Sequence, residues 1–389
     1  MAQEQTVFSQ VLQFASYDDF YICVRRYNGN KGARRLSCWE QFLAMSFAQL
    51  THRESLRDIE VCLTAHRKDL YRSGFRSLVK RSTLADANET RDWRIYADFA
   101  QSLIKQARPM YADSELGLDL DATVYALDAT TIDLCLSLFP WASFRRAKGA
   151  VKLHTMIDIQ TAIPVFIDVT HGKVHDVTAL DHVVFQPGSY LVMDRGYIDF
   201  HRLYQIHQAM TYFVVRAKDN LQFRRQASCA VDKASGLRSD QTIVLTGPKT
   251  STLYTAPLRR ISYYSEEMDK RFVFLTNDFN LPPLTVAALY RKRWQIELFF
   301  KWIKQHLRIK RFFGTSPNAV KTQIWIAVAA YVLIAIIKKQ LKLDHSLYTI
   351  LQILSTTLFE KMPVQSVFQR YDDNANTVES SNQLILFEI

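Results

Sequence analysis

One carboxylate lies among several cations in the segment Tyr290–Lys304, whose sequence is YRKRWQIELFFKWIK. At about 100° per residue, a helix here would gather five polar side chains within an arc of roughly 80°. These are Tyr290, Arg293, Glu297, Lys301 and Lys304. Residues 291–311 hold eight Lys or Arg and one Glu, which is a net +7 out of +11 for the whole chain. A single carboxylate in so basic a segment indicates a metal ligand beside phosphate-binding side chains.

An ordinary exposed helix face is the alternative interpretation of this segment. Ion pairs such as Arg293–Glu297 and Glu297–Lys301 would stabilise it. The charge count disfavours that alternative, because stabilisation by pairing would need more acids than one. On the opposite side of the helix, apolar residues are expected to pack against the core; they are Ile296, Phe299, Trp302 and Ile303.

Two aspartates follow apolar segments that are typical of buried strands. Asp128 follows Val124–Leu127, and Asp194 follows Tyr190–Met193. A carboxylate at the end of a buried strand must be paired, hydrogen-bonded or bound to a metal. Each aspartate alone is weak evidence, since such residues often cap turns. Nearby competitors are Asp119, Asp121, Asp133 and Asp158.

Two strand aspartates and one helix glutamate form a more specific set than any one of them. Three carboxylates from three elements can hold two Mg²⁺ ions roughly 3.5–4 Å apart, which is the arrangement that catalyses phosphoryl transfer. Hard oxygen donors without a His or Cys cluster favour Mg²⁺ or Mn²⁺ over zinc. We therefore predict Asp128, Asp194 and Glu297 as catalytic, metal-binding residues for two such ions.

The elements that would position these residues belong to a mixed α/β chain. Residues 1 to about 110 have helical periodicity, and Thr51 with Glu54 forms a capping-box pattern. Short strands are predicted at 124–129, 152–158, 163–170, 190–193 and 212–216, with helices at 176–184 and 200–209. Residues 219–277 again have the pattern of strands and turns. Helices follow over 284–341, broken near 314–317, and over 346–359, and residues 372–383 are expected to be disordered.

Composition limits the class of protein. The 389 residues are 48% hydrophobic, which excludes disorder over most of the chain, and a charge of +11 favours a polyanionic partner such as nucleic acid. Five cysteines without a C-x-x-C pair, and no secretory signal, predict a cytoplasmic protein. Ile324–Ile337 is too short to span a bilayer, so we expect a buried core helix and no membrane partner.

These residues also resemble a known family. Tyr290-x₂-Arg293-x₃-Glu297-x₆-Lys304 is similar to the Y-R-E-K signature of the insertion-sequence-four family of bacterial DDE transposases. Other blocks resemble that family's motifs: Lys80–Asn88 its N-terminal motif, Leu127–Thr131 its first-aspartate block, Lys148–Thr155 the following strand, and Met193–Tyr197 its second-aspartate block. The similarity covers about residues 80–315.

The resemblance implies a fold and roles for individual residues. It implies an RNase H-like (retroviral integrase) core with a β-strand insertion, and Asp128, Asp194 and Glu297 as the catalytic triad. Tyr290, Arg293 and Lys304 would contact DNA. Arg195 would contact a phosphate, with a simple ion pair as the alternative. Phe272 lies where hairpin-forming relatives carry a base-stacking Trp, although alternation with Phe274 favours a core position.

The expected domains follow the same scheme. They are a helical N-terminal domain (1–115), a first core part (116–218), a β-rich insertion (219–280), a second core part with the Y-R-E-K helix (281–345), and a C-terminal helix with a disordered tail (346–389). The N-terminal domain is a candidate for DNA binding as a helix-turn-helix variant, although its scattered basic residues slightly favour the alternative, a solvated face on an ordinary helical bundle.

The expected function is that of a DNA transposase. It would bind the terminal inverted repeats of its element as a homodimer on DNA, cut the ends and join them to target DNA with Mg²⁺. The alternative is a non-catalytic DNA-binding regulator or a decayed transposase, and a host nuclease on the same core is a further rival.

Overall fold

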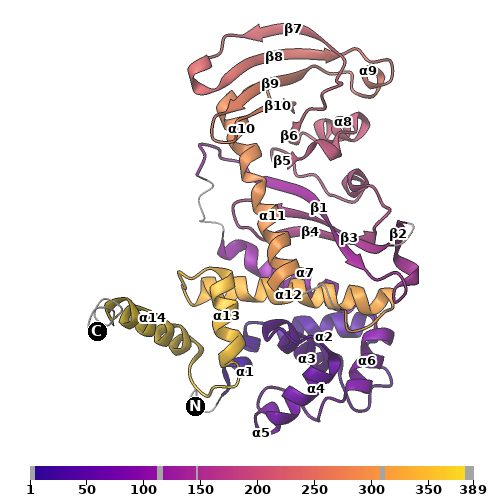
Figure 1. Ribbon diagram of the computed structural model, residues 1–389. Helices are drawn as coiled ribbons and strands as arrows, with labels where there is room; N and C mark the ends of the chain where they lie inside the picture. The colour runs from indigo at the N-terminus through magenta and orange to yellow at the C-terminus, as the bar shows by residue number, and fades with distance from the viewer. Residues whose placement is uncertain (1–4, 112–116, 146–147, 307–311, 382–389) are drawn as a thin grey trace, which may run out of the picture. The chain divides into compact units, whose positions relative to one another are not determined.

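The computed structural model describes residues 5–111, 117–145, 148–306 and 312–381 (Figure 1). The chain forms two compact units. One combines Met1–Met110 with Lys301–Ile389, and the other is Tyr111–Phe300. The chain therefore leaves the first unit to build the second and then returns to it. The five-segment division expected from the sequence follows motifs rather than compactness, and it stays a prediction.

The first unit is helical in its described residues, as the periodicity predicted. Its helices are α1 (Val7–Gln13), α2 (Tyr17–Arg26), α3 (Cys38–Leu50), α4 (Leu56–Ala65), α5 (Arg67–Leu70), α6 (Arg81–Thr90), α7 (Arg94–Met110), α12 (Pro317–Gln340), α13 (Leu347–Thr357) and α14 (Val364–Ser381). Helix α12 packs against α3, α6, α7 and α13 (Figure 1). The unit is thus built around a central apolar helix.

Helix α12 begins where the sequence predicted a break. Ser316 accepts the Ala319 N–H at 3.1 Å, and Pro317 occupies the first turn, where it loses no hydrogen bond. By length and composition α12 could cross a membrane, but 94% of its most apolar window is buried within the protein. The expectation of a buried core helix is confirmed.

Three local expectations were wrong. Thr51 ends α3, and α4 starts at the next good cap, Ser55; the capping box forms instead at Ser37 and Glu40. The helix expected at 176–184 is a 3₁₀ helix, Asp176–Asp181. The polar segment from 372 continues α14 to Ser381, where no Gly or Pro interrupts the helix.

The second unit is built on one sheet of ten strands among its described residues. These are β1 (Val124–Leu134), β2 (Ser143–Arg145), β3 (Lys148–Asp158), β4 (Pro164–His171), β5 (Tyr190–Met193), β6 (Tyr212–Arg216), β7 (Phe223–Cys229), β8 (Leu237–Leu245), β9 (Leu258–Ser265) and β10 (Lys270–Thr276). Their spatial order is β4-β3-β1-β5-β6-β10-β9-β8-β7, with β2 also on β3. The mixed α/β class expected from the sequence is confirmed.

Strand direction divides this sheet into two parts. The β4, β3 and β1 strands are antiparallel, whereas β1, β5 and β6 run parallel. Helix α8 (Phe200–Gln208) connects β5 to β6, as a parallel crossover requires. The antiparallel strands β7 to β10 then extend the sheet beyond β6 (Figure 1). The β-rich segment predicted over 219–277 is therefore part of the same sheet.

Two short helices lead from the last strand towards the carboxylates. They are α10 (Pro283–Lys292) and α11 (Trp294–Lys301), and Arg293 lies between them. The junction is tightened by i→i+3 bonds from the Arg293 N–H to Tyr290 and from the Ile296 N–H to Arg293. A π-helical turn, Trp302–His306, follows in the first unit. The segment predicted as one continuous helix is thus interrupted twice.

Candidate active site

Neighbouring parallel strands carry the two predicted aspartates to the same level of the sheet. Leu127 of β1 pairs with Met193 of β5, so Asp128 and Asp194 come directly after paired positions. Both segments form strands because their residues are apolar and fully buried. Asp194 also accepts the Gly196 N–H at 2.6 Å, which turns the chain sharply away from the strand.

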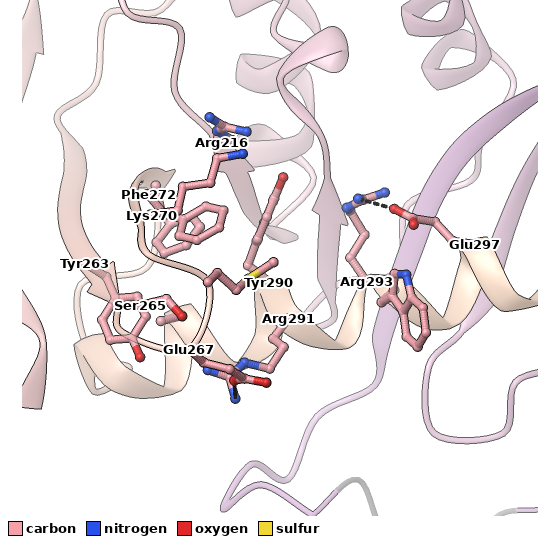
Figure 2. A pocket seen from close by; sticks show the side chains of 14 residues that line it. Arg216, Tyr263, Ser265, Glu267, Lys270, Phe272, Tyr290, Arg291, Arg293 and Glu297 are labelled. Carbon is pink, nitrogen blue, oxygen red and sulfur yellow. Dashed lines mark hydrogen bonds and ion pairs between the residues drawn. The ribbon is translucent and has the colours of Figure 1, made fainter.

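The Arg293 guanidinium joins the first aspartate to the predicted glutamate. Its Nη1 donates to Asp128 Oδ2 at 2.7 Å, and its Nη2 donates to Glu297 Oε1 at 2.6 Å (Figure 2 shows the second pair). The Arg293 side chain is only 16% exposed, which makes both contacts stronger than pairs on an open surface. The Arg293–Glu297 ion pair that an ordinary exposed helix face would contain is therefore present. The same guanidinium also binds Asp128 of β1, so the pair does more than stabilise the helix surface.

The carboxylates influence one another electrostatically. The pKa of Asp128 is raised to about 6, mainly by burial and to a smaller extent by the negative charges of Asp194 and Glu297; Arg293 and the Ala129 N–H oppose this shift. Burial beside the same carboxylates also raises the pKa of Tyr197, whose hydroxyl has no hydrogen-bond partner among the described residues. Such shifts are typical of functional sites, where like charges are held together.

A divalent metal fits the donors of this site but not their present arrangement. Asp128, Asp194 and Glu297 supply only hard oxygen ligands, which suit Mg²⁺ or Mn²⁺. Within the described part of the chain, no three His, Cys, Asp or Glu side chains lie close enough to hold one ion. The Arg293 guanidinium supplies the positive charge between Asp128 and Glu297 instead.

A pocket of about 560 Å³ opens beside Glu297. Helices α10 and α11 form one wall and the strands β6, β9 and β10 the other, as Figure 2 shows. Two carboxylates, Glu267 and Glu297, line it together with cations and aromatic rings, but cations outnumber acids: the cations are Arg216, Lys270, Arg291 and Arg293, and the rings are Tyr263, Phe272, Phe274, Tyr290 and Trp294. A concave site with this mixture suits an anionic group attached to a planar ring.

Phe272 lines this pocket and is only half buried. Its ring is parallel to that of buried Phe274, with centroids 6.0 Å apart. The guanidinium carbon of Arg216 lies 5.5 Å from the Phe272 centroid, and Lys270 Nζ lies at 5.8 Å. Alternation does put both phenylalanines on one face, but only Phe274 is core.

Tyr290 connects the pocket to the carboxylates. Its ring centroid lies 4.9 Å from that of Phe274, and the guanidinium carbon of Arg293 lies 5.7 Å from the Tyr290 ring. Burial raises the pKa of the Tyr290 phenol, so this side chain stays a neutral hydrogen-bonding group.

The remaining predicted residues have different surroundings. Arg195 is exposed at the start of the 3₁₀ turn after Asp194. Lys304 lies in the π-helical turn, where the α-helical spacing from Glu297 no longer applies, and it belongs to the first unit. Among the competing aspartates, Asp158 caps a turn through the Gln160 and Thr161 N–H groups, whereas Asp119, Asp121 and Asp133 are exposed.

Several pocket residues were missed by the sequence analysis, among them Trp294, Arg216 and Lys270. Trp294 lies inside the Y-R-E-K segment and is 59% exposed, which is unusual for a residue of its size. Arg216 is opposite Phe274 in the β6–β10 pairing, and Lys270 begins β10. The exposed tryptophan had a signal in the helical wheel. No local pattern indicates that Arg216 and Lys270 share a pocket, because the pairing of β6 with β10 brings them together.

Comparison with known families identifies the protein class. The transposase DDE domain family matches residues 119–333, which is more than half of the chain. The chain therefore belongs to the DDE transposase family. Residues 3–76 match a second family, described as a domain of unknown function.

Curated relatives agree with this assignment. The chain is 31% identical to the putative transposase y4zB of Sinorhizobium fredii over 288 residues, covering 73% of this chain and 79% of the relative. It is 29% identical to a probable transposase for insertion sequence element IS5377 of Geobacillus stearothermophilus, covering 56% and 57%. A putative transposase for element IS4SA of Synechocystis is 24% identical, covering 69% and 78%.

A solved structure is also similar at low identity. It is the cryo-EM structure of the piggyBac transposase synaptic complex with hairpin DNA, with a TM-score of 0.47, 10% identity, and coverage of 97% of this chain and 85% of that one.

Proposed function

We propose that this protein is a DNA transposase of the insertion-sequence-four type. It binds the terminal inverted repeats of its own element, cleaves the strands at the ends with Mg²⁺ or Mn²⁺, and joins them to target DNA. The observation that carries the proposal is the arrangement of Asp128, Arg293 and Glu297, in which strand and helix residues 165 positions apart meet through one guanidinium. Membership of the DDE transposase family supports it.

Strand order supports an RNase H-like core. Three antiparallel strands, β4, β3 and β1, are followed by two strands parallel to β1, and the carboxylates follow β5 and lie within β1. In such sheets ligands bind at the carboxyl ends of parallel strands. The strands β7 to β10 then correspond to the insertion that the family resemblance implies.

The chain's own residues have separable roles in this proposal. Asp128, Asp194 and Glu297 would hold two divalent ions, which when bound supply charge to activate the attacking oxygen and to stabilise the leaving oxygen. Asp128 must be ionised to ligate, so its raised pKa means that protons compete with the metal for this carboxylate at low pH. Arg293 balances the charge of Asp128 and Glu297 in the absence of metal and would release at least one of them when a metal ion binds.

DNA contacts are assigned to the basic and aromatic residues around the triad. Arg293 keeps an Nε–H without an acceptor among the described residues, which leaves a donor for a phosphate. Tyr290 and Phe272 line the pocket beside it, with Arg195 and Lys304 as further phosphate contacts. Because both ends of an element are processed together, a homodimer on DNA is the expected assembly, acting in the cytoplasm.

The test begins with the DNA that flanks the reading frame. Short inverted repeats should bracket it, and a fragment carrying one repeat should be nicked by the purified protein in Mg²⁺ but not in EDTA. Strand-transfer products would exclude a host nuclease. Tight binding to the repeat without nicking in Mg²⁺ or Mn²⁺ would favour the regulator and refute the proposal.

A further inference from the structure

Two loops of the first unit carry exposed cations and no acids. Residues 27–37 connect α2 to α3, and residues 71–80 connect α5 to α6. Neither segment contains Asp or Glu. Their exposed cations, which we call the two-loop surface, are Lys31, Arg34, Arg35, Arg72, Arg76 and Lys80. This part of the chain overlaps the domain of unknown function.

Hydrogen bonds hold the two loops side by side. Ser77 Oγ donates to the Arg35 carbonyl at 2.7 Å. The Glu40 carboxylate accepts the Arg76 N–H at 2.9 Å and the Ser37 N–H at 2.8 Å, so it links both loops. Because Glu40 is 3% exposed, its carboxylate lies beneath the loops and not on their outer face. The two loops that carry the six cations therefore lie against each other.

Among the described residues, two acids beside these loops form ion pairs. Glu60 contacts Lys80, with Nζ 3.5 Å from Oε1, and Asp69 is paired with Lys361. Within the described part of the chain, no ion pair reaches Lys31, Arg34, Arg35 or Arg76. Solvated surfaces normally interleave both signs, and a cluster of one sign costs free energy through repulsion. Such a surface is stabilised by an anionic partner.

The shape of the surface favours phosphates over base edges. The cations lie on loops rather than along one helix, and the loops turn at Gly32 and Gly74, which have φ of +76° and +95°. The apolar side chains Leu36, Phe75 and Val79 are 2–3% exposed. Tyr71, at 79%, is the one strongly exposed large apolar side chain of these loops, so they offer little apolar surface to a lipid layer. Arg and Lys on loops contact phosphate oxygens in any sequence.

We propose that the two-loop surface binds the phosphate backbone of duplex DNA, independently of base sequence. The choice of partner rests on the proposed transposase function; the existence of an anion-binding surface does not. This replaces the helix-turn-helix expected for the N-terminal domain with backbone contacts from two loops. Base-specific recognition of the element's ends then comes from another part of the chain.

The test uses the full-length protein and a random-sequence duplex in EDTA. The variant Lys31→Gln/Arg34→Gln/Arg35→Gln should make the slope of log affinity against log salt shallower by about 2.7, since each phosphate contact contributes about 0.9. The variant Arg76→Gln/Lys80→Gln should reduce it by about 1.8, because both loops form one surface. All substituted positions are exposed, and the thermal midpoint should not change.

A control with the same loss of charge comes from elsewhere in the first unit. Lys105→Gln/Arg108→Gln/Lys342→Gln removes three exposed cations from α7 and from the residues after α12, and it should leave the slope unchanged. Equal slope changes in the control and in the loop variants would overturn the proposal. So would loop variants that keep the wild-type slope for DNA but lose binding to phosphatidylserine vesicles.

The proposal and the transposase function can fail separately. Wild-type slopes in both loop variants, with Mg²⁺-dependent nicking by the wild-type protein, would refute only the two-loop surface. A second outcome is that the wild type binds duplex DNA without ever nicking it, while the loop variants have a shallower salt slope. This outcome would support the two-loop surface and contradict the transposase function. A wild-type protein that binds no duplex DNA would refute both.

Discussion

Arg293 is expected to compete with divalent metal for the carboxylates that it bridges. Its guanidinium is within 2.7 Å of Asp128 and 2.6 Å of Glu297, so a metal ion ligated by both carboxylates must displace at least one of these contacts. We expect Arg293→Gln to bind Mn²⁺ more tightly than the wild type in the absence of DNA, and to be less stable in metal-free buffer. Gln keeps polarity and removes the positive charge.

The expected magnitudes follow from the two contacts. A hydrogen bond to a charged group contributes about 1.5–3 kcal/mol, and losing one to a metal at the lower value corresponds to about tenfold in affinity. Removing one partner of a buried pair costs about 3–5 kcal/mol. Asp128 is 22% and Glu297 is 42% exposed, so solvent reduces this cost to about 2 kcal/mol. For a compact unit the size of Tyr111–Phe300, a loss of about 2 kcal/mol lowers the thermal midpoint by roughly 4–8 °C.

The assay combines calorimetric Mn²⁺ titration with thermal unfolding, both without DNA. The matched control is Arg291→Gln, which removes an arginine from the same pocket. Arg291 is exposed and pairs only weakly with Glu267, at 3.5 Å. The control should change neither Mn²⁺ affinity nor stability beyond about 0.5 kcal/mol.

Equal or weaker Mn²⁺ binding by Arg293→Gln would refute this reasoning. It would mean that Arg293 organises the ligands rather than competing for them. A variant with unchanged thermal midpoint would show that the bridge adds no stability. We expect Mn²⁺ to raise the thermal midpoint of Arg293→Gln more than that of the wild type.

Three further predictions concern protonation and DNA contacts. Since the pKa of Asp128 is raised from 3.8 to about 6, ionisation of this carboxyl is disfavoured in the folded state. In metal-free buffer, the free energy of unfolding of the wild type should therefore fall by up to about 3 kcal/mol relative to that of Asp128→Asn as the pH rises from 4 to above 6. A difference between the two unfolding free energies that does not change with pH, measured with denaturant, would contradict this. Phe272→Ala should slow second-strand processing of a pre-nicked end by an amount reflecting about 1–3 kcal/mol of stacking, with first-strand nicking near normal, whereas equal loss of both steps with a lower midpoint would identify a core residue. Lys304→Gln should make the salt slope of end binding shallower by about 0.9, and an unchanged slope would remove Lys304 from the phosphate contacts.

Local patterns predicted the elements better than their contacts. The apolar runs before Asp128 and Asp194 correctly indicated strands, because buried parallel strands are continuously hydrophobic. The pairing of Leu127 with Met193 was beyond the sequence, since strand order depends on long-range packing. The Arg293–Asp128 contact joins residues 165 positions apart for the same reason.

Helical periodicity predicted the buried face correctly, and Trp302 and Ile303 are buried even within the π-helical turn. Ile296 and Phe299 are buried as predicted, and Arg293 and Glu297 share a face at the i, i+4 spacing. Beyond residue 301 a π-helical turn changes the rotation per residue, so the predicted arc does not extend to Lys304. The sequence contains no signal for this turn, which tertiary packing decides.

The measurement that tests the central claim most directly is nicking of a DNA fragment carrying the element's end, compared among the wild type, Glu297→Gln and Asp194→Asn. Binding to the same fragment is measured in parallel by gel shift. We expect the wild type to nick and join DNA in Mg²⁺, while both variants bind the end normally and form no product, because each has lost a metal-binding carboxylate. Nicking by Glu297→Gln at the wild-type rate in Mg²⁺ would contradict the assignment of the triad.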